Sequence, residues 1–250
     1  MNENQVRALL AEANALVTDR HFVYSRPKGH GDHGSVYIDK DACFWDPDIL
    51  MDLAEGIAEL FLDYNVQVIA GPADGAIGLA GFVGYQLADP HDPTDGCKAC
   101  FLIKDDNSET GFSLRSAFKV AGKRVLVVED IINSGDRARN TVATLRAAGA
   151  EVIGLSCLAN QGIETAESLD VPEFKPLIIS FEFSKMSEED CLDHGLCADG
   201  VSIETKLGHG KDFLERLAVQ RGLSRALTPD SSTSADNLAK QRLESDIAGG

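Results

Sequence analysis

One apolar segment of the chain ends in two adjacent acids, Glu129 and Asp130. The preceding residues 124–128 are mostly valine and leucine, which is typical of a buried strand. The chain then continues into an expected helix through Ile131, Ile132, Asn133, Ser134, Gly135, Asp136 and Arg137. Backbone N–H groups of such a loop can bind an anion, and the two acids can accept hydrogen bonds from vicinal hydroxyls. The pattern favours a sugar phosphate, although its spacing fits an ordinary capped strand end equally well.

Glycines mark a second strand-to-helix turn earlier in the chain. Gly71 and Gly75 stand between an expected strand over 66–70 and an expected helix over 76–87, where ligands bind in open α/β sheets. Three more glycines recur along that helix, at Gly78, Gly81 and Gly84. This spacing predicts a smooth helix face packed closely on the sheet. It does not match the GxGxxG fingerprint of nicotinamide-binding oxidoreductases.

The cysteines do not show the spacing of a small disulfide-rich secreted domain. Residues 1–5 are polar and do not resemble a signal peptide, so we expect a cytoplasmic protein with reduced thiols. Two pairs could together form a four-cysteine zinc site, Cys97-x-x-Cys100 and Cys191-x5-Cys197. Cys100 opens an expected strand, so it fits a core position equally well.

The elements that position these residues alternate between helices and strands. From residue 46 the expected order is helix 46–61, strand 66–70, helix 76–87, strand 100–103, loop 104–121, strand 124–128, helix 136–148, strand 151–158 and strand 177–181. Asp46 and Pro47 give the first of these helices its N-cap and first position. The alternation predicts an α/β fold with a doubly wound parallel sheet covered on both faces.

The two ends of the chain do not follow this alternation. We expect a helix over 4–17 and two short strands, 21–24 and 35–39, around a polar loop. Three residues in that loop could bind a metal or simply form a polar hairpin tip: His30, Asp32 and His33. The segment 228–250 is rich in small polar residues and is predicted to be a disordered tail.

The net charge of −17 limits the possible partners. Such an acidic chain is repelled by phosphate backbones and anionic membranes, so we expect neither nucleic acid nor a membrane as a partner. The longest weakly polar run, 76–88, is shorter than the roughly 20 residues of a membrane span. Residues 104–139 carry a net charge of +1, which is compatible with binding a small anion.

Together, these motifs resemble those of the type I phosphoribosyltransferases, in a divergent bacterial subgroup that is orotate phosphoribosyltransferase-like. Residues 124–137 resemble the motif that binds phosphoribosyl pyrophosphate (PRPP). Four other segments are similar in order: 35–41 to the start of the hood, 69–73 to the pyrophosphate loop, and 197–201 and 208–213 to the C-terminal end. The resemblance covers residues 15–220. It implies one domain over 1–227, with a small hood built from 18–45 and the C-terminal segment.

The resemblance also implies a reaction, in which a nitrogenous base takes the phosphoribosyl group of PRPP and pyrophosphate leaves. The resemblance further implies Mg²⁺ as the cofactor and a homodimer, with a pyrimidine such as orotate as one candidate base. Glu129 and Asp130 would hold the ribose hydroxyls, and Asp130 would meet the PRPP-bound Mg²⁺. Residues 133–137 would bind the 5′-phosphate. The pyrophosphate would contact Gly71, Pro72 and Ala73. Lys104 and Arg115 would supply the catalytic positive charges. The base would contact Tyr37, Ile38 and Gln161.

Four departures from the family pattern keep a second interpretation open. Asn133 and Asp136 stand where Thr or Ser is usual, and a carboxylate about 4 Å from a phosphate would cost about 4 kcal/mol at an effective dielectric constant of 20. No lysine lies near 74–75, and the loop 104–109 has few cations. Gln161 lies where an arginine that helps to bind orotate is usual. The alternative is a catalytically degenerate regulatory protein that binds PRPP or a nucleotide.

Overall fold

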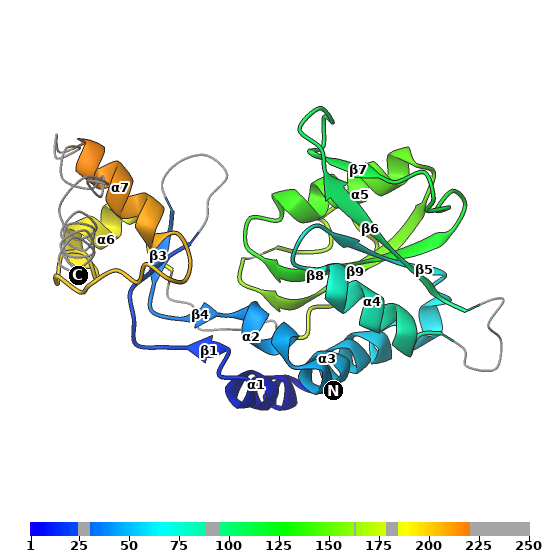
Figure 1. Cartoon of the computed structure of the whole chain (residues 1–250), viewed down its shortest axis with the longest axis horizontal. Coiled ribbons are helices and arrows are strands. Elements are labelled where there is room, and N and C mark those ends of the chain that lie inside the picture. The colour runs from blue at the N-terminus through cyan, green and yellow to red at the C-terminus, as the bar shows by residue number, and fades with distance from the viewer. Residues whose placement is uncertain (25–30, 89–95, 163, 179–184, 221–250) are drawn as a thin grey trace, which may run out of the picture.

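The computed structural model describes residues 1–24, 31–88, 96–162, 164–178 and 185–220. Its centre is a five-stranded sheet with the order β7-β6-β5-β8-β9 (Figure 1). The strands are β5 (Val68–Pro72), β6 (Lys98–Lys104), β7 (Phe112–Leu114), β8 (Arg124–Ile132) and β9 (Glu151–Asn160). All neighbouring pairs are parallel except β6 and β7. This arrangement confirms the expected α/β fold, and β8 extends through both acids of the motif.

Helices cover both faces of the sheet, because the strand residues are apolar on both sides. Leu126 and Val128 of β8 belong to one core cluster, which includes α3 (Pro47–Glu59) and α4 (Ile77–Gln86). The alternate residues of β8 belong to a second cluster with α5 (Asp136–Ala147). Asp46 caps α3 as expected, since its side chain accepts from the N–H of Asp48 at 3.0 Å. A short 3-10 helix, η1 (Leu62–Tyr64), links α3 to β5.

The N-terminal residues form small paired strands, with a pairing that differs from the expected one. The elements are α1 (Glu3–Glu12), β1 (Leu16–Val17), β2 (Phe22–Val23), β3 (His33–Gly34), β4 (Tyr37–Ile38) and α2 (Lys40–Trp45). β2 pairs with β3 and β1 pairs with β4, all antiparallel. The expected helix over 4–17 therefore ends early, because its last residues pair with β4 instead.

The C-terminal segment packs against these strands (Figure 1), and we call the two together the hood. It contains α6 (Glu188–His194) and α7 (Gly210–Gln220). His33 and Met186 exchange two backbone hydrogen bonds, of 2.8 and 2.9 Å. Phe213 of α7 is buried, and its ring packs edge-on against His33, with 4.8 Å between the centroids. The hood thus combines residues from both ends of the described chain.

Three other sequence predictions can be compared with the structure residue by residue. The expected strand 177–181 is described only to Ile178, which bridges Ala159 of β9 in parallel. The glycines of α4 were predicted to pack closely on the sheet. This is right only for Gly84, where an added Cβ would lie 3.3 Å from the Cβ of Ala99. Gly78 and Gly81 are exposed instead. The tail 228–250 and His30 lie outside the described residues.

Among the described residues, no helix is long and apolar enough to cross a membrane.

Candidate active site

Two adjoining cavities lie where β8 leads into α5. The first, of about 260 Å³, is enclosed by the loop residues 131–138 and Glu129. The second, of about 250 Å³, lies between this loop and the hood. Ile131, Asn133 and Arg137 line both cavities. The predicted sugar-phosphate motif therefore forms one wall of a two-part pocket.

Arg139 holds the loop that encloses the first cavity. Its guanidinium donates to the backbone oxygen of Ser134 at 2.5 Å and to Glu164 Oε2 at 3.0 Å. Gly135 takes a positive φ of 70°, and any side chain there would press against Arg139 Nη1. The loop ends at the N-terminus of α5, whose first N–H groups lack intrahelical acceptors. This is the geometry of an anion-binding site.

Asp136 does not present an isolated charge to this cavity. Its carboxylate accepts from Arg139 Nη2 at 2.7 Å and from Ser134 Oγ at 3.1 Å. The expected repulsion of about 4 kcal/mol assumed an unpaired carboxylate. The structure contradicts that assumption, because a cation one helical turn away neutralises Asp136.

Glu129 and Asp130 are both buried, with 1% and 4% of their surface exposed, and Arg137 lies beside both of them. Arg137 binds Glu129 through two hydrogen bonds, of 2.9 and 3.1 Å. Asp130 lies 3.6 Å from Arg137 Nη2 and also 3.6 Å from Lys40 Nζ. Burial, reinforced by the charge of Asp130, raises the pKa of Glu129 to about 8, although Arg137 opposes this effect. The two buried acids are therefore balanced by the charges of Arg137 and Lys40.

The predicted pyrophosphate loop follows β5, next to β8 in the sheet. Residues 71–73 are buried, and the peptide bond between Ala73 and Asp74 is cis. Lys104, at the end of β6, donates to Asp74 Oδ2 at 2.8 Å. This hydrogen bond lowers the pKa of Asp74. Lys104 therefore lies beside this loop.

Gly75 joins the pyrophosphate loop to the acid pair. A Cβ atom at this position would overlap Asp130 Oδ2 and would contact the side chain of Lys40. Only glycine therefore lets the turn approach the carboxylate this closely. The glycine-containing turn after β5 and the acid pair of β8 therefore meet here, although they lie some fifty-five residues apart in sequence.

Arg115 is not brought to either cavity. Leu114 pairs with Leu102, so the residue after it lies beside the middle of β6. Its guanidinium is stacked over the ring of Phe101, 5.5 Å from the centroid. The antiparallel register of β7 thus carries Arg115 away from the edge where Lys104 lies.

The three residues predicted to contact the base lie together in the second cavity: Tyr37, Ile38 and Gln161. The ring of Tyr37 stacks on Phe22 with 5.2 Å between the centroids. Burial raises the pKa of Tyr37, which keeps the phenol neutral. The backbone of Gln161 is fixed by donation to Ile132 O at 2.8 Å. The arrangement offers hydrogen-bonding groups and an aromatic ring in one place.

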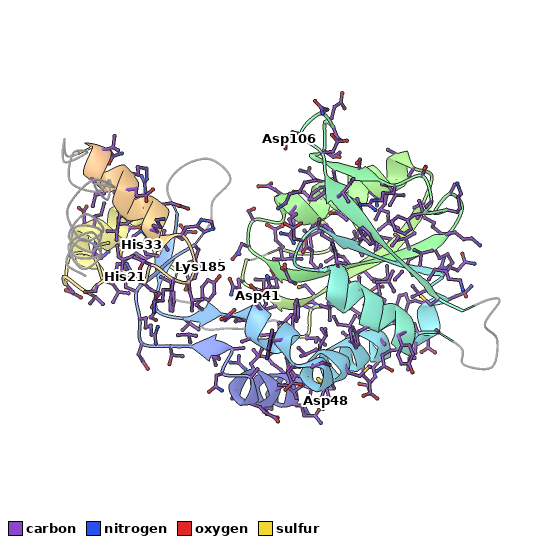
Figure 2. All side chains as sticks on the ribbon, viewed as in Figure 1. His21, His33, Asp41, Asp48, Asp106 and Lys185 are labelled. Carbon is purple, nitrogen blue, oxygen red and sulfur yellow. The ribbon has the colours of Figure 1, made fainter. Side chains whose placement is uncertain are left out.

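Sequence reasoning did not assign several other residues that surround this pocket. The second cavity is also lined by Tyr24, Lys40, Gly208 and His209. Lys40 and His209 fall in segments that resembled the family, so that resemblance was a signal for them. Lys185 had no such signal, yet its Nζ donates to Asn133 Oδ1 at 3.2 Å. Figure 2 shows Lys185 and Asp41 between the hood and the sheet domain, and Asp106 at the tip of the β6–β7 hairpin.

The structure does not bring the two cysteine pairs together as the alternative of a four-cysteine zinc site would require. Cys97 and Cys100 belong to the sheet domain, where Cys100 is buried within β6. Cys191 and Cys197 lie in the hood instead, beside two histidines. The pairs belong to separate parts of the fold, which spacing along the chain could not reveal.

A comparison with protein families places this architecture in a known class. The profile of the phosphoribosyl transferase domain matches residues 46–184. The chain belongs to the phosphoribosyltransferase family. Its curated relatives are named as enzymes.

The relatives point to one branch of that family. The chain is 29% identical over 189 residues to the orotate phosphoribosyltransferase of Caldanaerobacter subterraneus subsp. tengcongensis, covering 75% of this chain and 88% of the relative. It is 29% identical over 212 residues to the orotate phosphoribosyltransferase of Helicobacter pylori strain P12, covering 80% and 96%. The solved orotate phosphoribosyltransferase of Aeropyrum pernix is 20% identical, with a TM-score of 0.54, covering 69% and 92%. That structural likeness shows the shared type I fold.

Proposed function

We propose that this protein transfers the phosphoribosyl group of PRPP to a pyrimidine base such as orotate and releases pyrophosphate. One observation supports this most strongly. The anion-binding loop, the buried acids and the base-sized cavity lie side by side, in the order that a 5′-phosphate, a ribose and a base would need. The relatives named orotate phosphoribosyltransferase support the choice of base.

Each part of PRPP has a matching part of the pocket. The loop 133–137 would bind the 5′-phosphate with backbone N–H groups. Asp130 would accept hydrogen bonds from the ribose hydroxyls, and Glu129 lines the adjoining cavity. Residues 71–73 and Lys104 would meet the pyrophosphate. Arg137, now held by Glu129, is within reach of the phosphate cavity that it lines.

Catalysis of this reaction requires mainly that the two substrates are positioned correctly and that the developing charge is stabilised. A ring nitrogen of the base forms a bond to C1′ while the bond from C1′ to the pyrophosphate oxygen breaks. Positive charge that develops on the ribose is stabilised by the buried carboxylate of Asp130. The hood holds the base over C1′, which lowers the entropic part of the barrier.

The residues present fit a magnesium ion carried by PRPP. Mg²⁺ prefers oxygen ligands, and it is commonly held by one or two carboxylates together with substrate phosphates. Asp130 offers such a carboxylate beside the proposed ribose position. The ion, when bound, would neutralise charge on the leaving pyrophosphate.

The second cavity also suits an anionic pyrimidine. Lys40 supplies a cation there, so the missing arginine at position 161 does not leave the cavity without positive charge. Gln161 can both donate to and accept from the edge of a pyrimidine.

A catalytically degenerate regulatory protein is the second candidate. The placement of Arg115 favours it, because the register of β7 directs that cation away from the proposed pyrophosphate position. Such a protein would bind PRPP in the same loop without turnover.

Calorimetry with PRPP and Mg²⁺, followed by pyrophosphate-release assays with a panel of bases, distinguishes the candidates. We expect saturable binding, and release that depends on a pyrimidine base. Binding without release for any base would favour the regulatory protein. Absence of binding would overturn both. Asp106→Asn, on the exposed hairpin tip, is the matched control for substitutions of Asp130.

A further inference from the structure

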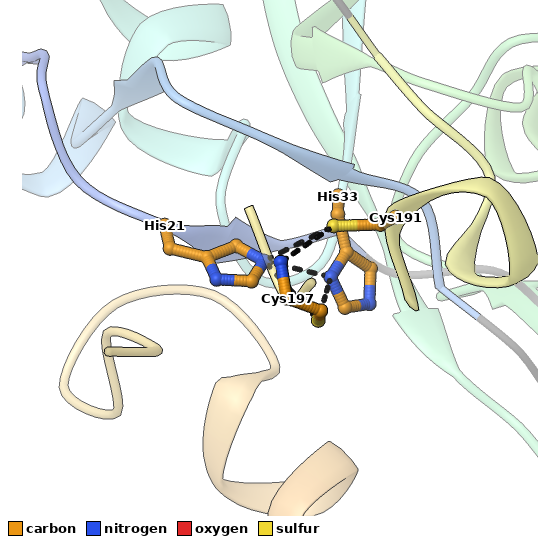
Figure 3. Close-up of side chains that lie close together, drawn as sticks. All are labelled: His21, His33, Cys191 and Cys197. Carbon is orange, nitrogen blue, oxygen red and sulfur yellow. Dashed lines mark hydrogen bonds between the residues drawn. The ribbon is translucent and has the colours of Figure 1, made fainter. Parts of the chain in front are cut away.

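Four potential metal ligands from both ends of the described chain meet inside the hood: His21, His33, Cys191 and Cys197 (Figure 3). One ligand atom from each residue lies within 4.8 Å of all the others. Both histidines and Cys191 are buried, with at most 1% of their surface exposed. None of them lines either of the two cavities of the candidate active site.

The distances between these atoms are close to those of a tetrahedral zinc site. Cys191 Sγ lies 3.6 Å from His21 Nε2, and Cys197 Sγ lies 3.5 Å from His33 Nδ1 and 3.8 Å from His21 Nε2. Zinc bonds of about 2.0–2.1 Å to nitrogen and about 2.3 Å to sulfur imply separations of about 3.3–3.8 Å between tetrahedral ligands. The two imidazole nitrogens are closer, at 2.8 Å, so a bound ion would move the rings slightly apart.

Neighbouring groups orient the ligand atoms toward a common centre. His21 Nδ1 lies 3.0 Å from Val201 O, so its N–H donates there and leaves the Nε2 lone pair facing the cluster. Metal-bound histidines commonly donate their other ring N–H to a backbone oxygen in this way. The N–H of Cys197 donates to Cys191 Sγ at 3.4 Å, which suits a thiolate.

Hydrogen bonds within the cluster leave one of its buried polar atoms without a partner. Because His21 donates from Nδ1, its contact with His33 needs the proton on His33 Nδ1. His33 Nε2 would then be a buried acceptor, and this atom has no hydrogen-bond partner among the described residues. A cation bound to His21 Nε2 and His33 Nδ1 would replace the proton between the two rings, and the ring proton of His33 would then lie on Nε2.

We propose that His21, His33, Cys191 and Cys197 bind a structural Zn²⁺ ion in the hood. Two thiolates and two neutral imidazoles form a donor set that zinc prefers. The two thiolate charges balance the charge of the ion, so the buried site is neutral overall. Four protein ligands leave no open position for a substrate, which is typical of a structural site.

Such an ion would fix the wall of the second cavity. Its ligands join the strands β2 and β3 to α6 and the turn that follows it. From there the chain returns to the same strands, since Glu204 donates to His21 O and His209 to Val23 O, both at 2.8 Å. His209 lines the second cavity. Zinc binding would therefore couple hood folding to the shape of the base pocket.

Metal content of the full chain tests this proposal directly. We expect stoichiometric zinc in protein prepared with zinc and a reductant. Replacement by Co²⁺ should give the visible bands of a tetrahedral site and a thiolate-to-cobalt charge-transfer band. Cys191→Ser and Cys197→Ser should lose the metal, whereas Cys97→Ser, in the sheet domain, should keep it.

Three results would overturn the proposal. These are wild-type protein without stoichiometric zinc, variants of Cys191 that retain it fully, and a Cys191–Cys197 disulfide found by mass spectrometry in the reduced preparation. Should a serine variant fail to fold, the Co²⁺ spectrum of the wild type still decides. All these measurements are made without PRPP, so their outcome is independent of the proposed function.

Discussion

The two adjacent acids of β8 have different surroundings because successive side chains of a strand point to opposite faces. Glu129 faces the first cavity and is held by Arg137, whereas Asp130 faces the second cavity near Lys40 and Gly75. The same two-residue motif therefore supplies one acid that organises a cation and one that is open to a ligand.

Asp130→Asn is expected to weaken PRPP binding more than Glu129→Gln. The carboxyl group of Asp130 lies beside two cations, and each hydrogen bond that a charged group makes contributes about 1.5–3 kcal/mol. Glutamine at 129 imitates a carboxyl group whose pKa is already raised to about 8. Calorimetric titration of both variants and Asp106→Asn measures the effect. Equal affinities for all variants and the wild type would contradict the ribose assignment.

The raised pKa of Glu129 also predicts a pH dependence of stability. Its folded-state pKa of about 8 exceeds the ordinary value of 4.5, so between these values the folded state binds the extra proton. Its contribution is fully present below about pH 4.5 and is lost as the pH rises through about 8, by at most about 1.4 kcal/mol per unit. The difference in unfolding free energy between wild type and Glu129→Gln should fall over that window. Urea unfolding at several pH values measures it, and a constant difference would show that Arg137 keeps Glu129 ionised.

At the scale of elements, the site forms where loops leave the carboxyl ends of adjacent parallel strands. The order of apolar and polar residues was enough to predict β5, β8, α5 and a loop of small residues between the last two. It left open whether Asp136 pairs with Arg137, with Arg139 or with neither, because an i,i+3 pair is only one of several rotamer choices. It also could not give the register of β7, which decides where Arg115 lies.

Asp136→Thr is expected to weaken PRPP binding, by roughly two- to fivefold. The substitution removes a half-exposed partner of Arg139, and such pairs contribute up to about 1 kcal/mol. Arg139 would then hold Ser134 and the phosphate loop less firmly. Titration of Asp136→Thr and Asp136→Asn with PRPP at fixed Mg²⁺ tests this. Tighter binding by both variants would show that repulsion of the phosphate dominates after all.

Gly75→Ala is expected to abolish measurable PRPP binding. The new methyl group would overlap Asp130 Oδ2, so the turn or the carboxylate must move. Gly81→Ala on the next helix is the matched control, since nothing lies within 4 Å of its added Cβ. That control should keep binding and should gain up to about 1 kcal/mol of stability. Unchanged PRPP affinity in Gly75→Ala would show that the approach of Gly75 to Asp130 has no role in the site.

At the scale of the whole molecule, the hood joins segments that are about 170 residues apart in sequence. Periodicity describes only local structure, so it predicted the sheet domain well and the hood poorly. The actual pairing of β2 with β3, the contact of Lys185 with Asn133 and the meeting of His21 with Cys191 are all long-range contacts. Only the resemblance to a family indicated that the two ends of the chain come together.

The extent of the folded unit can be tested by removing residues after Leu227. The composition of 228–250 offers little apolar surface to bury, so the shortened chain should keep its melting temperature and its PRPP affinity. Phe213→Ala is the contrasting variant, because this ring is 3% exposed and packs on His33. Loss of such a buried ring costs about 3–5 kcal/mol, and each kcal/mol lowers the melting temperature of a chain this size by about 2–4 °C. Thermal unfolding of both proteins, followed by circular dichroism, measures the two effects. A truncated chain that melts as early as Phe213→Ala would show that the tail packs against the folded unit.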